Sequence, residues 1–442
     1  MIRTGVRYSD GALLRPQDFR RALERMLALG SPVLQGSALT KIVGAAGCKP
    51  GRPCDLSRGM IVGPHNTLTV RLSAADSRLL LSLVSVVPVP AGIPPTDVGR
   101  KPLPSTGPYT IDSYVPGRQL TVVRNRHFRP WSERARPSGY PDEIVWRIGV
   151  PRDKAIRQVV DGKADLVLNT VPADRVEDIA ARYPHRVHLV PQRATAFVFL
   201  NTRRAPFDDV RVRQALNYAV DRTKMAELHG GSAVAQPTCQ AVPPTVPGHR
   251  PCCPYTIDPD SSGEWKAPDL AKARELVAAS GTTGQSVVVR TFPFFAKEAR
   301  YFVSLLHRLG YRARLEEFQD IEHYFSTLNR TPNVQAGFAG WFGNHLAADS
   351  FTTLTCDFAQ NWAHFCDRRF DAAVNRLAPR QAHDPAAGAA LAARLDREVV
   401  DRAPWVPLFT PRFADFTSKR VGNYQANTYA SSSVLLDQLW VR

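Results

Sequence analysis

The sequence lacks any long apolar run. Its most apolar stretch, residues 79–87, contains nine residues between Arg78 and Pro88, whereas a helix that spans a bilayer needs about 20. The opening residues, Met1 to Gly5, also lack the apolar segment of a signal peptide. We therefore do not expect an integral membrane protein, but an exported protein whose leader is missing from this chain is compatible with the sequence.

Motifs of known catalytic and metal sites are absent as well. The sequence contains no G-x-S-x-G, H-E-x-x-H or Walker motif. Cys356, His364 and Asp367 lie close together and raise the alternative of a cysteine nucleophile, but Cys366 is near enough to form a disulfide with Cys356 in an oxidising compartment. Glu316 and Glu317 are adjacent on a predicted strand, so they face opposite sides and form no acid–base pair. The sequence therefore predicts neither an enzyme nor a cofactor or metal site.

Lysine is scarce, and arginine supplies most of the positive charge. The sequence contains ten lysines against 47 arginines, and the excess of Lys+Arg (57) over Asp+Glu (40) gives a formal net charge of +17. Basic proteins often bind nucleic acids through the phosphates. Here the charges are scattered, with no run of five or six and no basic helix. We interpret them as a solvated arginine-rich surface and expect no nucleic-acid partner.

The remaining composition is that of a globular protein. Of the 442 residues, 44% are hydrophobic and 22% are charged, close to the averages of folded domains. At about 150 residues per domain, this length corresponds to two or three domains. The 36 prolines indicate many turns and long connections.

The seven cysteines lie in polar or irregular stretches, not in apolar helices. They form three local groups: Cys48 with Cys54, Cys239 with Cys252 and Cys253, and Cys356 with Cys366. Short-range pairs in loops are typical of disulfides formed in an oxidising compartment. Zinc binding is the alternative, but the C-x-x-C spacing and a His-x-x-x-His partner are missing. We therefore favour three disulfides, which leaves one free thiol.

Hydrophobic periodicity predicts most of the secondary structure. Helices are predicted over residues 16–29, 209–221, 270–280 and 385–402, and strands over 119–124, 144–150, 164–168 and 196–200. Residues 287–340 have a β-α-β-α-β pattern, with strands at 287–290, 312–318 and 335–340 and helices at 297–309 and 321–328. This alternation predicts a mainly parallel sheet with helices on its faces. A long loop is expected over 230–268, and short apolar runs separated by turns from residue 405 onward.

Two aromatic segments, residues 292–295 and 341–345, follow strands of this predicted sheet. Ligands of such sheets bind beyond the carboxyl ends of the strands. Core packing is the alternative for any single aromatic residue, but the adjacent Gly and Pro residues favour a ligand pocket.

Short motifs occur in a defined order along the chain. They include the opening strand and turn at residues 2–11, Thr-Gly-Pro-Tyr at 106–109, Arg-Asn-x-x-Phe at 124–128 and Pro-Phe-Asp-Asp-Val-Arg-Val-Arg-Gln-Ala at 206–215. Together they resemble the bacterial extracellular solute-binding proteins of family 5, the oligopeptide/dipeptide-binding class of ABC-transporter substrate-binding proteins. The cysteine groups and the closing residues 439–442 resemble its actinobacterial branch.

The resemblance implies an α/β fold, a two-lobed periplasmic-binding-protein-like clamp (type II, cluster C). Lobe I would hold residues 1–190, with a small variable subdomain at about 12–100, and the C-terminal return at 412–442; lobe II would hold residues 195–410. Two crossings between the lobes would act as hinges. Family members carry a leader and the first part of lobe I before the Ile2–Gly5 strand, so we expect this chain to be N-terminally truncated.

The implied function is that of a monomeric solute-binding component of an ABC importer, exported to the cell surface or another extracytoplasmic location. It would capture a peptide or other small polar solute between its lobes and deliver it to a membrane permease, through hinge closure and without breaking a bond. The alternatives are a ligand-sensing lobe of a larger signalling or regulatory protein, and a truncated, non-functional binding protein.

The resemblance also assigns individual residues. It pairs Cys239 with Cys253 and leaves Cys252 without a partner. Asn344 stands where peptide binders of the family carry an Asp that pairs with the amino terminus of the peptide. Because an amide does not supply that charge pair, a neutral or sugar-like ligand is an alternative to a peptide. The predicted ligand-binding residues are Trp341, Phe342, Asn344 and His345, with Phe294 and Phe295 as opposing aromatics.

Overall fold

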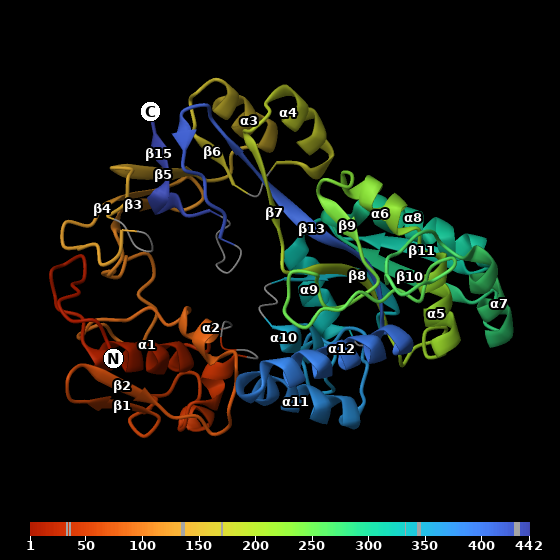
Figure 1. Ribbon diagram of the computed structural model, residues 1–442, viewed down its shortest axis with the longest axis horizontal. Helices are drawn as coiled ribbons and strands as arrows, with labels where there is room; N and C mark the ends of the chain where they lie inside the picture. The colour runs from red at the N-terminus through yellow and green to blue at the C-terminus, as the bar shows by residue number, and fades with distance from the viewer. Residues whose placement is uncertain are drawn as a thin grey trace. The chain divides into compact units, whose positions relative to one another are not determined.

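The computed structural model describes the chain apart from residues 32–33, 35–36, 134–137, 169–170, 332, 343–345 and 428–433. The described residues form two compact units: residues 1–166 with 417–427 and 434–442, and residues 167–416. Figure 1 labels most of the helices and strands of both units. The lobe boundaries expected near residues 190–195 and 410–412 remain predictions.

The first unit combines a small helical core with short antiparallel sheets. Its elements are α1 (Pro16–Ala28), β1 (Met60–Gly63), β2 (Thr67–Val70), α2 (Leu79–Leu83), β3 (Tyr109–Val115), β4 (Gln119–Arg124), β5 (Glu143–Arg147), α3 (Arg152–Val160), β14 (Val421–Gly422) and β15 (Trp440–Val441). Pro16 occupies the first turn of α1, where a missing N–H costs nothing. Leu23 of α1 packs with Leu39 and Met60 in the core of this unit.

The second unit is built on a mixed sheet flanked by helices. Its elements are α4 (Val176–Arg182), β7 (Val187–Pro191), β8 (Thr195–Leu200), α5 (Val210–Ala219), α6 (Arg222–His229), β9 (Ala235–Pro237), α7 (Leu270–Ser280), β10 (Ser286–Thr291), α8 (Ala296–Arg308), β11 (Arg312–Glu317), α9 (Ile321–Arg330), β12 (Ala336–Trp341), α10 (Ala347–Thr352), α11 (Arg368–His383), α12 (Pro385–Arg402) and β13 (Trp405–Thr417). The strands follow the order β11-β10-β12-β8-β13-β6, and β7 and β9 also pair with β13. The short strand β6 (Leu166–Val167) begins at the last residue of the first unit. As predicted, β10, β11 and β12 are parallel, whereas β8 is antiparallel to β12 and β13.

Helices on this sheet are held by aromatic contacts. α8 packs on β10 and β11, and its Phe302 ring lies edge-on to Phe338 of β12 at 5.9 Å. Tyr324 of α9 donates a hydrogen bond to the Phe338 carbonyl at 2.6 Å. Gly337 permits α9 to pack this closely, because a Cβ there would lie 2.7 Å from the Tyr324 hydroxyl.

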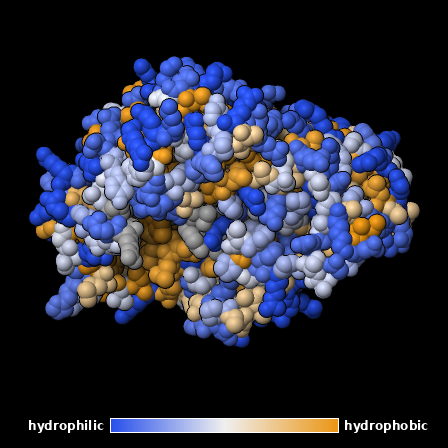
Figure 2. All heavy atoms as spheres, turned by 45° about the horizontal axis from the view of Figure 1, so that its top comes forward, coloured by the Kyte–Doolittle hydropathy of each residue, from blue (hydrophilic) through white to orange (hydrophobic). Residues whose placement is uncertain are grey.

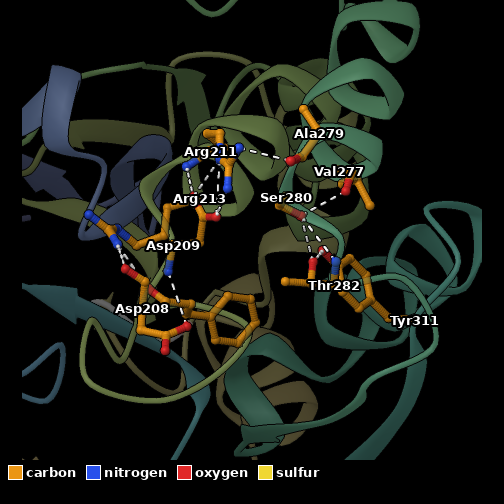
Figure 3. A network of polar contacts seen from close by, with 10 residues as sticks. Asp208, Asp209, Arg211, Arg213, Val277, Ala279, Ser280, Thr282 and Tyr311 are labelled. Atoms are coloured by element: carbon orange, nitrogen blue, oxygen red, sulfur yellow. Dashed lines mark hydrogen bonds and ion pairs between the residues drawn. The ribbon is translucent and has the colours of Figure 1, made fainter.

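The motif at residues 206–215 joins helices to one another. Asp209 caps α5, since its side chain accepts a hydrogen bond from the Arg211 N–H at 2.8 Å. The Arg211 guanidinium donates to the Ala279 carbonyl in the last turn of α7 (Figure 3). Arg213 donates to the carbonyl of Arg402, the last residue of α12, at 2.8 Å. The side chains of this motif therefore fix α5 against α7 and α12.

All three predicted disulfides are confirmed: Cys48–Cys54, Cys239–Cys253 and Cys356–Cys366. Cys252 is the free thiol, and its Sγ lies 3.2 Å from Nη1 of Arg397. The Cys356–Cys366 bond removes the thiol that a cysteine nucleophile needs. We therefore drop the alternative of a nucleophile at Cys356.

The chain after residue 405 differs from the sequence prediction. Short apolar runs separated by turns were expected there, but Trp405–Thr417 form one continuous strand, β13. The strand contains prolines at 407 and 411, although proline is normally confined to edge strands and bulges. A register shift between Pro407 and Phe409 accommodates the first proline, and pairing with β7, β8 and β9 supports the rest. The prediction was wrong for residues 405–417, because these pairings are non-local. After Thr417 the described chain forms only short elements, such as β14 and β15, as expected.

A buried carboxyl anchors the long loop at 230–268 to α12. Asp396 is 1% exposed and accepts hydrogen bonds from the N–H groups of Ala241 and Val242, at 3.1 and 3.3 Å, and from Gln240 Nε2 at 2.6 Å. Burial raises the pKa of Asp396 to about 7, although these hydrogen bonds oppose the shift.

This carboxyl should make the protein less stable as the pH rises from about 4 to about 7. Its pKa in the folded chain, about 7, lies above the unfolded value near 4, so the native state binds more protons in this window. The unfolding free energy should fall by at most about 1.4 kcal/mol per pH unit. Asp396→Asn resembles the protonated acid and should remove that slope, as measured by melting temperatures from pH 4 to 8. Asp401→Asn, at an exposed carboxylate of the same helix, is the control. If the melting temperatures of Asp396→Asn and of the parent chain change with pH in the same way, Asp396 is not the source of the pH dependence.

The most apolar stretch of the sequence forms only the short helix α2 and the residues after it, and several of its side chains are exposed. Leu80 and Val84 are 76% and 72% exposed. The face in Figure 2 is mostly hydrophilic, with apolar residues gathered in separate patches. Within the described residues, no helix combines the length and the apolar character that crossing a membrane requires.

Candidate functional site

The carboxyl ends of three parallel strands lie at one edge of the sheet in the second unit. β10 pairs in parallel with β11 on one side and with β12 on the other. The last residues of these strands are Thr291, Glu317 and Trp341. Both aromatic segments singled out in the sequence therefore start at the same edge, because one follows β10 and the other ends β12.

The segment after β10 divides between core and surface. Phe292 and Phe295 are 6% and 1% exposed, and their rings pack on Tyr324 (4.9 Å) and Phe338 (5.6 Å) respectively. Phe294 is 45% exposed and lies edge-on to Phe295 at 4.8 Å. Within this segment only Phe294 offers a ring face to solvent, and Phe295 supports it from the core.

The end of β12 presents two further aromatic side chains. Trp341 is half-buried, and its ring lies edge-on to Phe358 at 5.7 Å. Phe342 is 44% exposed and stacks on Phe413 of β13, with 5.8 Å between ring centroids and 25° between planes. This pair leaves ring surface accessible beside the strand end.

Strand β13 supports the aromatic side chains that follow β10 and those at the end of β12. The His229 ring of α6 lies between Phe294, at 5.0 Å, and Phe409 of β13, at 4.5 Å. Four residues further along β13, Phe413 supports Phe342. Sequence reasoning missed His229 and Phe413, because nothing in the local pattern of α6 or β13 indicates that they approach the ends of β10 and β12.

A buried polar pair holds His229 in place. His229 Nδ1 lies 2.7 Å from Glu298 Oε1, and the two residues are 9% and 2% exposed. Glu298 is in the first turn of α8 and His229 in the last turn of α6, where the helix dipoles favour a carboxylate and an imidazole respectively. The pair therefore fixes the ring on which Phe294 rests.

We use the name aromatic surface for Phe294, Trp341, Phe342 and Phe413. Exposed and half-buried rings of this kind bind apolar faces by stacking and cations by attraction to the ring face. Of the six residues predicted to bind ligand, Asn344 and His345 lie outside the described residues, and Phe295 has almost no accessible surface. The described residues contain no group of three or more His, Cys, Asp or Glu side chains arranged to hold a metal ion.

Comparison with known families identifies the chain. The family model described as "Bacterial extracellular solute-binding proteins, family 5 Middle" matches residues 1–361. The chain belongs to this family. The family predicted from the ordered motifs is therefore confirmed, whereas the actinobacterial branch and the N-terminal truncation remain predictions.

Curated relatives of this family 5 protein are distant in sequence. Di/tripeptide-binding protein 2 of Pseudomonas aeruginosa is 25% identical over 362 residues, which cover 77% of this chain and 63% of the relative. The periplasmic murein peptide-binding protein MppA of Escherichia coli is 22% identical over 431 residues, which cover 92% and 76%. The chain thus spans less than two thirds of the length of the first of these relatives.

Solved structures show the fold that the family 5 chain shares. The Escherichia coli murein tripeptide binding protein MppA superposes with a TM-score of 0.79 at 20% identity, over 100% of this chain and 86% of that one. Clavulanic acid biosynthesis oligopeptide binding protein 2 gives a TM-score of 0.82 at 22% identity, over 100% and 82%. The predicted fold class, a two-lobed α/β protein, is confirmed by this likeness.

Proposed function

We propose that this protein is the solute-binding component of an ABC importer, exported from the cytoplasm and active as a monomer. It captures a peptide or other small polar solute and delivers it to a membrane permease, by binding and without catalysis. Membership of family 5 and relatives named for peptide binding support this proposal. Three disulfides fit an oxidising, extracytoplasmic compartment.

We propose that the aromatic surface contacts the ligand, with Asn344 and His345 as its polar neighbours. The observation that carries this assignment is the uneven exposure of the rings at the sheet edge. Phe294 and Phe342 are 45% and 44% exposed, while the adjacent Phe295 is 1% exposed. Exposed aromatic rings gathered at strand ends are typical of ligand surfaces. Phe295 is left out of the proposed contact surface.

The identity of residue 344 shapes the ligand class that we propose. A carboxylate at this position would pair with the charged amino terminus of a peptide, and such charge-assisted hydrogen bonds are about twice as strong as neutral ones. An asparagine offers hydrogen bonds without the charge. We therefore propose that the site accepts amino-terminally blocked peptides or neutral polar solutes as readily as free peptides.

A thermal-shift screen of the full chain tests the proposed function. Short peptides, their N-acetylated forms, sugars and opines are compared by the melting temperature. A ligand at 100 times its dissociation constant adds about 2.7 kcal/mol of stability, which corresponds to a rise of about 5–10 °C for a unit of this size. We expect at least one compound to reach this shift, and N-acetylation to leave the shift of a peptide unchanged.

Two outcomes would contradict the proposal. If no compound raises the melting temperature of the folded chain, the protein does not bind solutes of these classes. If a panel of esters and peptides is hydrolysed by the purified chain, and the Trp341→Ala variant hydrolyses it equally well, the protein is an enzyme with a site elsewhere.

A further inference from the structure

A groove follows the helical hairpin of α11 and α12, which are joined at Asp384. It encloses about 650 Å³, within the range of small-molecule sites, roughly 300–1,000 Å³. α11 contributes Arg376, Arg380 and His383, which lie on one face of the helix at spacings of four and three residues. α12 contributes Arg394. The groove shares no lining residue with the aromatic surface.

The basic side chains of this groove have no acidic partner. In the part of the chain that the structure describes, Arg376, Arg380, His383 and Arg394 make no ion pair and no side-chain hydrogen bond. The residues that line the groove include no carboxylate. The nearest acid in sequence, Asp384, accepts a hydrogen bond from the Ala387 N–H and thereby caps α12.

Other arginines on the same two helices behave differently. Arg368 pairs with Asp357, Arg397 with Asp401, and Arg402 with Glu398, at 2.7, 2.9 and 2.9 Å. Arg369 of α11 also lies outside the groove and makes no ion pair among the described residues. Three of the four arginines of the hairpin outside the groove are therefore paired, whereas none of the three inside it is. Clustered guanidinium groups repel one another, and an anion between them removes that repulsion.

The floor of the groove is apolar. Pro379 of α11 and Leu391 of α12 line the groove and are half-buried, whereas its basic side chains are exposed. A guanidinium binds a carboxylate or a phosphate through two parallel hydrogen bonds, which suits it to anchor one anionic head group. A ligand that satisfies both parts of the groove carries an anionic head and an apolar body.

We propose that the α11–α12 groove binds an anionic amphiphile, a small molecule with one carboxylate or phosphate group and a short apolar chain. Arg376 and Arg380 hold the head group, with Arg394 opposite them on α12, and the chain lies on Pro379 and Leu391. This site is independent of the proposed capture of solutes at the aromatic surface.

Isothermal titration of the full chain with n-octyl phosphate, below its micelle concentration, tests the proposal. n-Octyl glucoside supplies the apolar chain without the charge, and inorganic phosphate supplies the charge without the chain. We expect one saturable site for octyl phosphate and at least about tenfold weaker binding of the other two probes. The affinity for octyl phosphate should fall as NaCl is raised from about 50 to about 300 mM, because salt screens exposed charges.

Variants locate the site. Arg376→Gln/Arg380→Gln should bind octyl phosphate at least about tenfold more weakly, and Ala390→Glu, which adds a negative charge to the lining, should do the same. The matched control is Arg274→Gln/Arg312→Gln, which removes two charges at exposed positions on α7 and β11. Circular dichroism and melting temperatures verify that all variants fold. Trp341→Ala should bind octyl phosphate as the parent chain does, which separates this test from that of the proposed function.

Several results would overturn the proposal. Equal affinity of the Arg376/Arg380 variant and its control would exclude the groove. If octyl glucoside binds as tightly as octyl phosphate, the groove does not require an anionic group. If inorganic phosphate binds as tightly as octyl phosphate, the groove does not require an apolar chain. Sedimentation with phosphatidylglycerol vesicles, without binding of monomeric octyl phosphate, would assign the groove to a membrane surface.

Discussion

Replacing Arg222 by methionine should lower the unfolding free energy of the second unit by about 3–5 kcal/mol. Arg222, the first residue of α6, is completely buried, and its guanidinium donates only to neutral oxygens. Nε donates to the carbonyls of Thr238 and Pro407, both at 2.9 Å, and Nη1 donates to the carbonyl of Asn217 at 3.0 Å. These three carbonyls belong to the end of α5, the 230–268 loop and β13, so a single side chain joins three segments of the second unit.

The expected loss of unfolding free energy arises from the backbone carbonyls to which methionine cannot donate hydrogen bonds. Burial lowers the pKa of Arg222 to about 9, so the charge itself is costly inside the protein. Its removal recovers part of that cost, but several buried carbonyls then lose their donor, at about 1–3 kcal/mol for each unsatisfied group. Lysine should be intermediate, because it keeps the charge but lacks the planar set of donors that reaches separate carbonyls.

Calorimetry of the full chain measures this effect. A loss of 3–5 kcal/mol corresponds to a fall of roughly 6–20 °C in the melting temperature for a unit of this size. Arg274→Met, at an exposed arginine of α7, serves as the control and should change stability by less than about 0.5 kcal/mol. A melting temperature for Arg222→Met within the error of the control would show that the carbonyls find other donors.

Replacing Trp341 by alanine should weaken ligand binding by about 30-fold or more, equivalent to about 2 kcal/mol or more. Trp341 ends β12 at the edge where the parallel strands finish, and it is half-buried, so part of its ring remains available to a ligand. Large aromatic side chains that become desolvated on binding dominate binding energies. The ligand for this test is the compound with the largest shift in the thermal screen, and titration calorimetry measures its affinity.

The effect on folding should be much smaller than the effect on binding. Trp341 contacts Phe358 edge-on, and losing that contact should cost about 1–2 kcal/mol of stability. Trp265→Ala removes another half-buried tryptophan of the same unit and should leave the affinity unchanged. Unaltered affinity in a folded Trp341→Ala variant would remove Trp341 from the proposed contact surface.

The parallel sheet was predictable because its signals are local. The strands β10, β11 and β12 and the helices α8 and α9 start and end within two residues of the predicted bounds. Their apolar residues repeat at the period of the element, and that period depends only on the backbone geometry of the segment. Closeness in sequence located the three cysteine groups, because each disulfide closes a loop of only 6 to 14 residues. The choice of Cys253 as the partner of Cys239 came from the family resemblance.

Elements that depend on contacts between distant parts of the chain were not predicted from the sequence. The helix α11 was not predicted, since Pro379 interrupts its pattern, and it is held by packing against α12. β13 was mistaken for short runs because its prolines are tolerated only through pairing with strands far away in the chain. Local propensity is a weak guide wherever tertiary contacts override it.

The candidate site shows most clearly the difference between features set by the local sequence and features set by tertiary contacts. By itself, the sequence determined the family, the disulfide-forming cysteines and the sheet edge at which aromatic residues gather. Only the tertiary structure decided that Phe295 is core while Phe294 is exposed, although the two are adjacent, and that His229 and Phe413 support the exposed rings. The physical reason is that burial depends on which distant segments pack against a side chain, and the periodicity of one segment does not contain that information.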